Sequence, residues 1–416
     1  MNLKKEFYKN NRKKLLERVE DNSIVLLFSG KAPYKSADET YQFSVNRNFY
    51  YMSGISRENF ILMLAKINGK PSESLFIERG DPVLARWFGE KMKVEEAQEI
   101  SGVESVNYID ELESVFSNLL NRNRIESIYL DLERQEWNIP ISEANSFALS
   151  VKEKYPALKV ENIHNVIGDM RVIKSPEEIE LLRKAIHITN EGIKNIWRNA
   201  KPGMMEYELE AYFDFVLKSR GVKDFAFKTI MASGKNATVL HYSQNNSKVK
   251  ENDLVLMDLG AQFDYYNADI SRTFPISGKF TKRQREVYDV VLRAQKAVEE
   301  TAKPGLPFKR LNEVAREVLA EGCKELGLIK KDSELSNYYF HGVSHYIGLD
   351  THDVGNRNLD LKPWMVMSDE PGLYIPEEGI GVRIEDDILI TEKGCEVLSK
   401  EIIKDPDEIE EFLATR

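Results

Sequence analysis

Two stretches in the second half of the chain place acidic side chains next to apolar, strand-like segments. Asp258 and Asp269 are eleven residues apart, and Glu370 and Glu385 are fifteen apart. Because both separations are odd, an antiparallel hairpin with an even loop brings the members of each pair opposite one another on one face. This pairing predicts turns centred between positions 263 and 264 and between positions 377 and 378. The second turn begins with proline and ends with glycine, which is typical turn chemistry.

Like charges that face each other destabilise a hairpin, so these pairs need a positive partner. A single acidic residue at a strand end is usually solvated. Here, however, Leu256 and Met257 lead directly into Asp258, and Ile384 and two further isoleucines surround Glu385. These apolar neighbours predict buried strands, where unpaired carboxylates are costly. Four carboxylates balance the charge of two divalent cations, and the pattern therefore predicts a metal site.

Histidines gather near the same acidic segments. Four of the six lie in the segments HYSQNN and HGVSHYIGLDTHD, and they are His241, His341, His345 and His352. A pair of hydrogen-bonded core histidines is one interpretation of the last segment, but its glycines disfavour a helix, and an extended chain would point positions 341 and 345 to one side. One imidazole with several carboxylates suits manganese, iron or cobalt, and also zinc.

The two remaining histidines are predicted to lie outside this site. His187 falls on a predicted helix and is expected to be a structural or surface residue, and His164 lies in a predicted linker and receives no role.

Composition excludes several classes of protein. The 416 residues correspond to two or three domains, and the formal net charge of -10, without a basic block, argues against a nucleic-acid-binding protein. The longest apolar run, Phe60 to Ala65, is too short for secretion or membrane spanning. Two isolated cysteines, Cys323 and Cys395, favour a reducing cytoplasm.

The elements that must position the site divide the chain in two. Residues 1–160 alternate predicted helices (3–20 and 94–101) with apolar strands that start near positions 23, 60, 74 and 127, which is typical of an α/β domain. A linker is expected over 161–174. At Ser175, a capping serine, a following proline and Glu178 predict the start of a helix and of a second domain, 175–416.

The second domain is predicted to contain an internal repeat. The sequence AKPG occurs at 200–203 and again at 302–305, each time between two predicted helices. The helix after the first copy is 207–220, and the helix after the second copy is 311–326. In each half a histidine-bearing segment and an acid-ending strand follow. The order indicates two related helix–helix–strand halves.

Specific segments resemble a known family, the pita-bread metallopeptidases, and within it the Xaa-Pro aminopeptidases (aminopeptidase P). The similar segments are ASGKNATVLHY, MDLGAQFDYYNADISRTFP, HGVSHYIGLDTHDVG and DEPGLYIPEEGIGVRIEDD, in the family's order. RNFYYMSGI and RWFGEKM resemble the amino-terminal domain of aminopeptidase P and prolidase. The resemblance covers nearly the whole chain. It implies a creatinase/prolidase-like α/β domain followed by a pita-bread domain with a pseudo-twofold repeat, an α/β (α+β) chain overall.

Carried over position by position, the resemblance implies a dinuclear metal centre. Its five ligands would be Asp258, Asp269, His345, Glu370 and Glu385, with the second and last of these shared between both ions. Manganese is the metal expected first, with cobalt, iron or zinc as alternatives. The two ions would hold a bridging water, lower its pKa and stabilise the oxyanion.

The resemblance also implies an activity, which is hydrolysis of the bond between an N-terminal residue and a following proline. Glu370 would be the general base and proton shuttle. His241 and His352 would contact the substrate and the tetrahedral intermediate, and His341 would be a further active-site and substrate-binding histidine. Arg383, two residues before a ligand, would orient the carboxylates.

Two alternatives remain beside this activity. Prolidase, an Xaa-Pro dipeptidase, has the same fold and ligands, and Ser344 in HGVSH favours aminopeptidase P because prolidases more often have HGLGH. A catalytically inactive pita-bread module that binds protein partners is the second alternative. Such modules typically have degraded ligand sets, whereas the set here is intact.

The expected partners are peptides with proline at the second position, and neither nucleic acid nor a membrane. A cytoplasmic homo-oligomer, a dimer or a tetramer, is expected from the resemblance. Trp87 in RWFGEKM is a candidate for such a contact, with an ordinary core tryptophan as the alternative.

Overall fold

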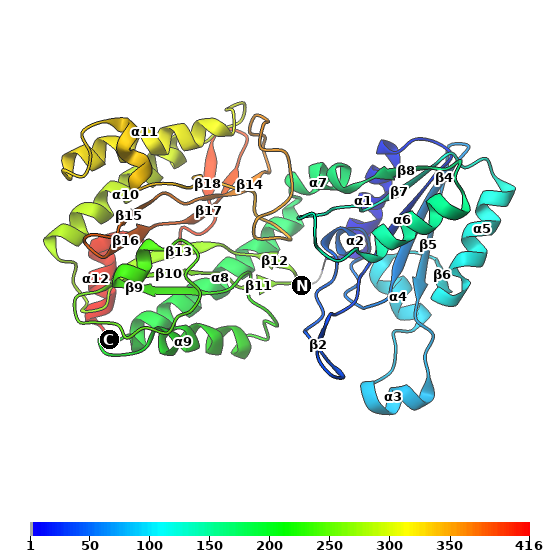
Figure 1. Cartoon of the computed structure of the whole chain (residues 1–416), viewed down its shortest axis with the longest axis horizontal. Coiled ribbons are helices and arrows are strands. Elements are labelled where there is room, and N and C mark those ends of the chain that lie inside the picture. Colours follow the sequence, from blue (N-terminus) through cyan, green and yellow to red (C-terminus); the bar gives the residue numbers. More distant parts are fainter. Residues whose placement is uncertain (1–2) are drawn as a thin grey trace. The chain divides into compact units, whose positions relative to one another are not determined.

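The computed structural model describes residues 3–416, and the chain divides into two compact units, Met1–Met170 and Arg171–Arg416 (Figure 1). Each unit is described by itself. The division falls within the segment 161–174 that the sequence predicts as a linker. This segment contains the end of strand β8 and helix α7.

The first unit is built on a mixed sheet with strand order β6-β5-β4-β1-β7-β8. Its elements are α1 (Lys5–Arg18), β1 (Ser23–Phe28), β2 (Tyr34–Ser36), β3 (Glu39–Thr40), α2 (Arg47–Ser53), β4 (Ile61–Ile67), β5 (Lys70–Ile77), α3 (Pro82–Phe88), α4 (Val94–Ser101), β6 (Ser105–Tyr108), α5 (Leu112–Arg122), β7 (Ser127–Leu130), α6 (Glu143–Lys154), β8 (Lys159–Asn162) and α7 (His164–Val172). The predicted helices and strands correspond to α1, β1, β4, β5, α4 and β7. The α/β class expected for residues 1–160 is confirmed.

Every second side chain of a strand points to the same face of this sheet, and the apolar side chains on one face pack against helices. Ile24 and Leu26 of β1 point to one face, where they pack with Phe116 of α5 and Val151 of α6 in a single apolar cluster. Helices α1 and α2 pack against strands β4 and β1. Buried apolar side chains such as Ile24 and Phe116 therefore hold the layers together.

The second unit consists of two halves, each of which begins with two helices and continues into a three-stranded sheet with a two-stranded hairpin. The first half contains α8 (Pro176–Asn199), α9 (Glu206–Ser219), β9 (Ile230–Ser233), the 3-10 helix η2 (Gly234–Thr238), β10 (Leu254–Leu259), β11 (Gln262–Phe263), β12 (Tyr266–Asn267) and β13 (Ile270–Pro275). The second half contains α10 (Lys282–Thr301), α11 (Lys309–Glu325), β14 (Val366–Asp369), β15 (Gly372–Ile375), β16 (Ile380–Arg383), β17 (Asp386–Ile390) and β18 (Cys395–Val397), followed by α12 (Pro406–Ala414). The predicted internal repeat is confirmed.

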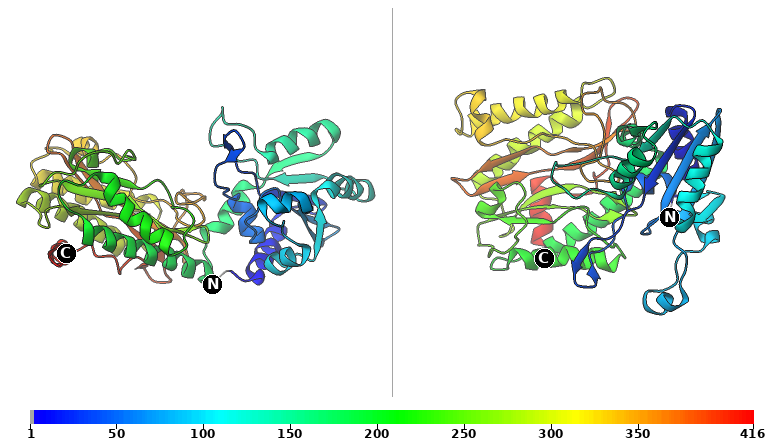
Figure 2. Two further views of the ribbon diagram at one scale, coloured as in Figure 1. Left: turned by 90° about the horizontal axis from the view of Figure 1, so that it is seen from below. Right: turned by 45° about the vertical axis from the view of Figure 1, so that its right-hand side comes forward.

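The two helix pairs begin and end alike. The Ser175 side chain accepts a hydrogen bond from Glu178 N at the start of α8, as predicted, and Thr281 caps α10 with Gln284 in the same arrangement. The two AKPG segments follow α8 and α10, and the alanine of each is the C-cap residue. In Figure 1 and in the right-hand view of Figure 2, the strands of this unit lie between the pair α8–α9 (green) and the pair α10–α11 (yellow).

The hairpin registers differ from the prediction in one half only. In the second half, Gly372 pairs with Arg383 and Asp369 with Asp386, which confirms the predicted turn centre. In the first half, Asp258 pairs with Ser271 and not with Asp269, so the predicted register was wrong by two residues. The turn is centred between positions 264 and 265, both of which have positive φ (47° and 69°). The parity is unchanged, and both aspartates therefore remain on one face.

Among residues 3–416, none of the helices combines the length and the apolar character that a membrane crossing requires.

Candidate metal centre

The acidic residues predicted from the two hairpins lie together in the second unit. Ligand atoms of Asp258, Asp269 and Glu385 all lie within 4.8 Å of one another, and those of His345, Glu370 and Glu385 form a second such group. Glu385 belongs to both of these groups, and a third group consists of Asp269, His345 and His352. The geometry thus provides two adjacent sets of oxygen and nitrogen donors of the kind that hold hard divalent cations.

Both halves of the repeat contribute to this cluster. Asp258 lies near the end of β10, Asp269 immediately precedes β13, and Glu385 lies between β16 and β17. The Glu385 N–H donates to Ser271 O at 3.0 Å, so the backbone of one half is bonded to the other beside the cluster. His345 lies in an irregular segment, and its backbone N–H donates to Ser368 Oγ at 3.0 Å.

Burial makes the cluster electrostatically unfavourable without a cation. Asp269 and Glu385 are 4% and 2% exposed. Burial, and then the charges of neighbouring carboxylates, raise the pKa of each well above its usual range. His345 Nε2 lies 3.4 Å from both Asp269 Oδ2 and Glu370 Oε1. Burial also raises the pKa of Glu370, although His345 and Arg383 oppose this effect.

The residues present fit a divalent metal. Among residues 3–416, Asp258 Oδ1 is buried and has no hydrogen-bond partner, which leaves an oxygen available as a ligand. Four carboxylates and one imidazole converge there, and their combined charge suits two divalent ions. The donor set contains no thiolate, in agreement with the oxygen-rich site predicted from the sequence.

Arg383 contacts the cluster through two routes. Its Nη2 donates to Asp258 Oδ2 at 2.6 Å, and its Nε donates to Ser271 Oγ at 2.7 Å. The Ser271 hydroxyl in turn donates to Glu385 Oε2 at 2.8 Å. Arg383 Nη1 also donates to the Tyr374 hydroxyl at 3.1 Å. Ser271 and Tyr374 were not predicted from the sequence, although Ser271 shares the strand face of Asp269 by simple alternation.

Three further predicted histidines line the same cavity. The cavity has a volume of about 520 Å³, lies entirely within the second unit, and is bordered by His241, His341 and His352 as well as by the acidic cluster. Phe227, Lys228 and Arg357, none of which was predicted, also line it. All eight predicted metal-binding and substrate-contacting residues therefore border one space large enough for a short peptide.

Two of the histidines near the cluster have a lowered pKa, which favours the neutral imidazole. His341 Nε2 lies 2.9 Å from the Tyr374 hydroxyl, and burial lowers the pKa of His341 to about 4. Partial burial and the adjacent His345 lower the pKa of His352 to about 4. The His345 and His352 rings meet edge to face, with centroids 4.3 Å apart. A neutral imidazole keeps one N–H donor for a hydrogen bond to a substrate.

The other two histidines lie elsewhere. His187 is exposed, with Nδ1 3.2 Å from Glu401 Oε1, as expected for a surface residue. In the first unit, His164 Nδ1 lies 2.9 Å from Asp131 Oδ1, a contact that belongs to the local structure of that unit. Trp87 is 78% exposed, so the alternative of a core tryptophan was wrong.

A two-unit chain with acids and histidines gathered from both halves of a repeat defines a class, the two-domain metallopeptidases. The model of metallopeptidase family M24 matches residues 180–392, and that of the aminopeptidase P N-terminal domain matches residues 8–129. The chain belongs to metallopeptidase family M24. This finding confirms the resemblance, the pita-bread fold and the dependence on divalent metal that the sequence predicts.

Individual relatives cover the full chain. The chain is 33% identical to an Xaa-Pro aminopeptidase of Escherichia coli (strain K12), with 99% of this chain and 98% of that protein aligned. A solved Bacillus anthracis structure, described provisionally as an aminopeptidase P, has a TM-score of 0.98 and 52% identity over 99% of both chains. Zinc-substituted E. coli aminopeptidase P in complex with product has a TM-score of 0.93 and 32% identity, and covers 100% of this chain and 99% of its own.

A dipeptidase is also similar. An Xaa-Pro dipeptidase of Pyrococcus furiosus is 35% identical over 313 residues, which covers 72% of this chain and 86% of that protein.

Proposed function

We propose that the protein is a metal-dependent Xaa-Pro aminopeptidase that removes an N-terminal residue when proline follows. The observation that carries this proposal is that the five predicted ligands and three further histidines border one cavity. The nearly full-length similarity to Xaa-Pro aminopeptidases supports it. The shorter match to the dipeptidase makes prolidase the second candidate.

The proposed ligands are Asp258, Asp269, His345, Glu370 and Glu385, and the proposed number of ions is two. When bound, divalent metal would supply Lewis-acid polarisation of the scissile carbonyl and a more acidic water. Manganese is the metal we propose first. Support for two ions comes from the two adjacent donor groups that share Glu385 and from the net charge of the carboxylates.

The protein's own groups would hold the substrate and move the proton. Glu370 takes a proton from the attacking water and later gives it to the leaving proline nitrogen, so that water is added across the peptide bond. Its Oε1 lies 3.4 Å from His345 Nε2, which places this carboxylate beside the other proposed ligands. His352 and His241 donate hydrogen bonds to the substrate and to the tetrahedral intermediate, and His341 binds beside them.

Arg383 would keep the carboxylates in place. Its bonds to Asp258 and, through Ser271, to Glu385 fix one oxygen of each group. The other carboxylate oxygens then remain directed to the cluster, which is a positioning role.

Cytoplasmic location and assembly into a dimer or tetramer stay predictions. The two cysteines are unpaired, which supports a reducing compartment. The exposed Trp87 and Phe88 side chains on α3 support a contact with another copy.

Substrate length distinguishes the two candidate activities. Protein freed of metal with a chelator should be inactive, and manganese should restore cleavage of a Gly-Pro-Xaa tripeptide far more than of Gly-Pro. Preferred cleavage of the dipeptide would identify a prolidase. Cleavage of neither peptide with any divalent metal, together with no bound metal, would support a binding module.

The ligand assignment has its own test. Asp269→Asn and Glu385→Gln keep the shape of each side chain but remove one negative charge, so we expect metal content to fall from about two equivalents and activity to be lost. Metal content is measured on purified protein by atomic emission. Wild-type metal content and activity in either variant would refute the assignment.

A further inference from the structure

The segment that carries His241 is held by a buried carboxylate on the neighbouring helix. Residues 234–247, called here the His241 loop, connect β9 to the segment before β10. Among residues 3–416, no hydrogen bond holds the His241 ring, although this ring lines the cavity. Its place is therefore set by the backbone of the loop, and the groups that fix this backbone decide where the ring lies.

Glu206, the first residue of α9, bonds to this loop and to Ser233, the residue that precedes it. It is 0% exposed. Its Oε1 accepts from Ser233 N at 2.8 Å, from Ser233 Oγ at 2.7 Å and from Asn236 Nδ2 at 3.0 Å. Five donors in all surround this carboxylate, since two more bond to its other oxygen. A buried carboxylate is stable when such donors satisfy its oxygens.

The other oxygen of Glu206 bonds to two residues that follow His241 in the loop. Glu206 Oε2 accepts from the Tyr242 hydroxyl at 2.7 Å and from Ser247 N at 2.9 Å. Tyr242 directly follows His241, and its ring packs against the apolar cluster that contains Ile230 and Leu256. The single carboxylate thus joins the start of the loop, its end and the residue next to the histidine.

One helical turn further on, a second carboxylate holds the same loop. Glu210 Oε2 accepts from Asn245 Nδ2 at 2.8 Å, and Asn245 Oδ1 accepts from Met231 N at 3.0 Å. Positions 206 and 210 lie on one face of α9 because they are four residues apart. Leu209 and the other buried apolar residues of α9 lie on the same face as Glu206 and anchor the helix.

We propose that Glu206 is a positioning residue that holds His241 in the substrate pocket by fixing the His241 loop to α9. The inference rests on the proposed function, because His241 is taken to contact the peptide there. Glu206 itself does not line the cavity. It acts through the loop, and its loss should therefore weaken peptide binding only while His241 is present.

Kinetics in two backgrounds test this coupling. Glu206→Gln places an NH₂ group against donors of the loop, and we expect KM for Gly-Pro-Xaa to rise by about tenfold with a smaller change in kcat. In the His241→Ala background the same substitution should change KM by less than about twofold. An equal rise in both backgrounds would overturn the proposal. The manganese-loaded wild-type protein provides the reference.

A second measurement needs no activity. Hydrogen–deuterium exchange of peptides that cover 239–247 should be faster in Glu206→Gln than in wild type, with exchange in β10 unchanged. Unchanged exchange in the loop would overturn the proposal. If wild type cleaved no Xaa-Pro peptide, the proposed function would fail, whereas the exchange result would still decide whether Glu206 holds the loop.

Matched variants separate the role from a general loss of stability. Glu208→Gln makes the same change on the same helix, at an exposed carboxylate that accepts from Met205 N at 2.7 Å, and should match wild type in both measurements. Tyr242→Phe removes one of the five bonds and should shift KM and exchange in the same direction as Glu206→Gln, by less. It carries both measurements if Glu206→Gln fails to fold.

Discussion

Arg383 is the cation closest to the acidic cluster, and its planar shape explains its contacts. The guanidinium reaches Asp258 Oδ2, Ser271 Oγ and the Tyr374 hydroxyl at the same time, each at 3.1 Å or less. A lysine ammonium at the end of a flexible chain cannot reproduce this fixed fork. The position therefore requires arginine for geometry as well as for charge.

Arg383→Lys should accordingly weaken metal binding. Loss of the contact to Asp258 or to Ser271 would free a carboxylate to rotate, and we expect metal affinity to fall by about 10- to 100-fold. Calorimetric titration of metal-free protein with manganese measures the change. Lys400→Arg, a substitution of an exposed residue, is the control. Equal affinity in Arg383→Lys and wild type would contradict the positioning role.

Residue types and spacing predicted the four acidic members of the cluster, and the family resemblance predicted His345 and Arg383, but Ser271 and Tyr374 were not predicted. Asp258, Asp269 and Glu385 are conspicuous because acids rarely follow buried strands. Ser271 and Tyr374 have ordinary side chains, and their role follows only from contacts with Arg383. Ser271 lies 112 positions before Arg383, a separation that no local pattern reveals, whereas Tyr374 lies nine positions before Arg383 in the β15–β16 hairpin.

At the scale of elements, the two hairpins show what turn chemistry can predict. In the second hairpin, proline and Gly379, with φ of 61°, define the turn, and the predicted register is confirmed. In the first, Asp264 and Tyr265 both adopt positive φ, as in a type I′ turn that usually contains Asn-Gly. Tyrosine gives no signal of this conformation, and the predicted register was therefore wrong.

The helix caps gave a stronger signal, and their energetic contribution can be measured. Ser175→Ala removes the acceptor for Glu178 N at the start of α8, and we expect the free energy of unfolding to fall by about 1 kcal/mol. Urea denaturation monitored by circular dichroism measures this change. Ser175→Thr keeps the hydroxyl and should lose much less. A loss of similar size in both variants would show that the cap is not the cause.

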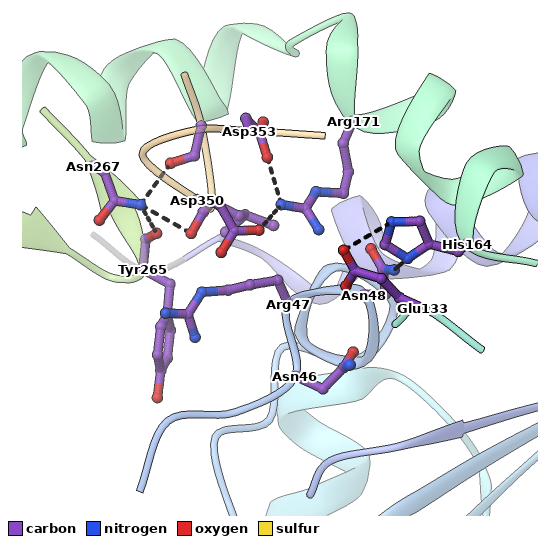
Figure 3. Close-up of polar contacts among 12 residues, drawn as sticks. Asn46, Arg47, Asn48, Glu133, His164, Arg171, Tyr265, Asn267, Asp350 and Asp353 are labelled. Carbon is purple, nitrogen blue, oxygen red and sulfur yellow. Dashed lines mark hydrogen bonds and ion pairs between the residues drawn. The ribbon is translucent and has the colours of Figure 1, made fainter. Parts of the chain in front are cut away.

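At the scale of the whole molecule, a buried ion cluster ties the start of the second unit to a distant loop. Arg171 Nη2 donates to Asp353 Oδ1 at 2.5 Å and to Asp350 Oδ2 at 2.6 Å (Figure 3). Lys174 Nζ donates to Asp353 Oδ2 at 2.8 Å. Asp353 follows His352 directly. The cluster therefore fixes the backbone next to a proposed substrate-binding residue.

Asp353→Asn should destabilise the protein at neutral pH. The change leaves two buried cations with one partner fewer, which costs about 3–5 kcal/mol. Chemical denaturation at pH 7 measures the loss. The control is Asp407→Asn, which changes an exposed aspartate that pairs with Arg285 and should change the stability far less.

Acid should remove the difference between wild type and Asp353→Asn. Burial by itself raises the pKa of Asp353, but the charges of Arg171 and Lys174 outweigh this effect and lower the pKa below its usual range. A carboxyl whose pKa is lower in the folded than in the unfolded protein stabilises the folded state at pH values above the unfolded pKa of about 3.9. This stabilisation is lost as the pH falls through the folded pKa. Denaturation curves measured from pH 5 downward should therefore converge. A constant difference would contradict this sign.

The α/β class and the repeated halves followed from the sequence, whereas the contacts of residues 171 and 174 did not. Arg171 and Lys174 fall in the predicted linker, yet both are buried and belong with the second unit. Their shared partner, Asp353, lies 182 and 179 residues later, respectively. Local composition cannot reveal that a linker position supplies a buried cation.

A fragment limited to the segment that matches the peptidase family would lose buried ion pairs of the second unit. The family match begins at residue 180, and the capped helix begins at 176. A fragment started at either point would lack both cations and would enclose the Asp353 carboxylate with its principal counter-ions missing. A fragment that contains the second unit should therefore include the residues from 171 onward, although their sequence gives no sign of this role.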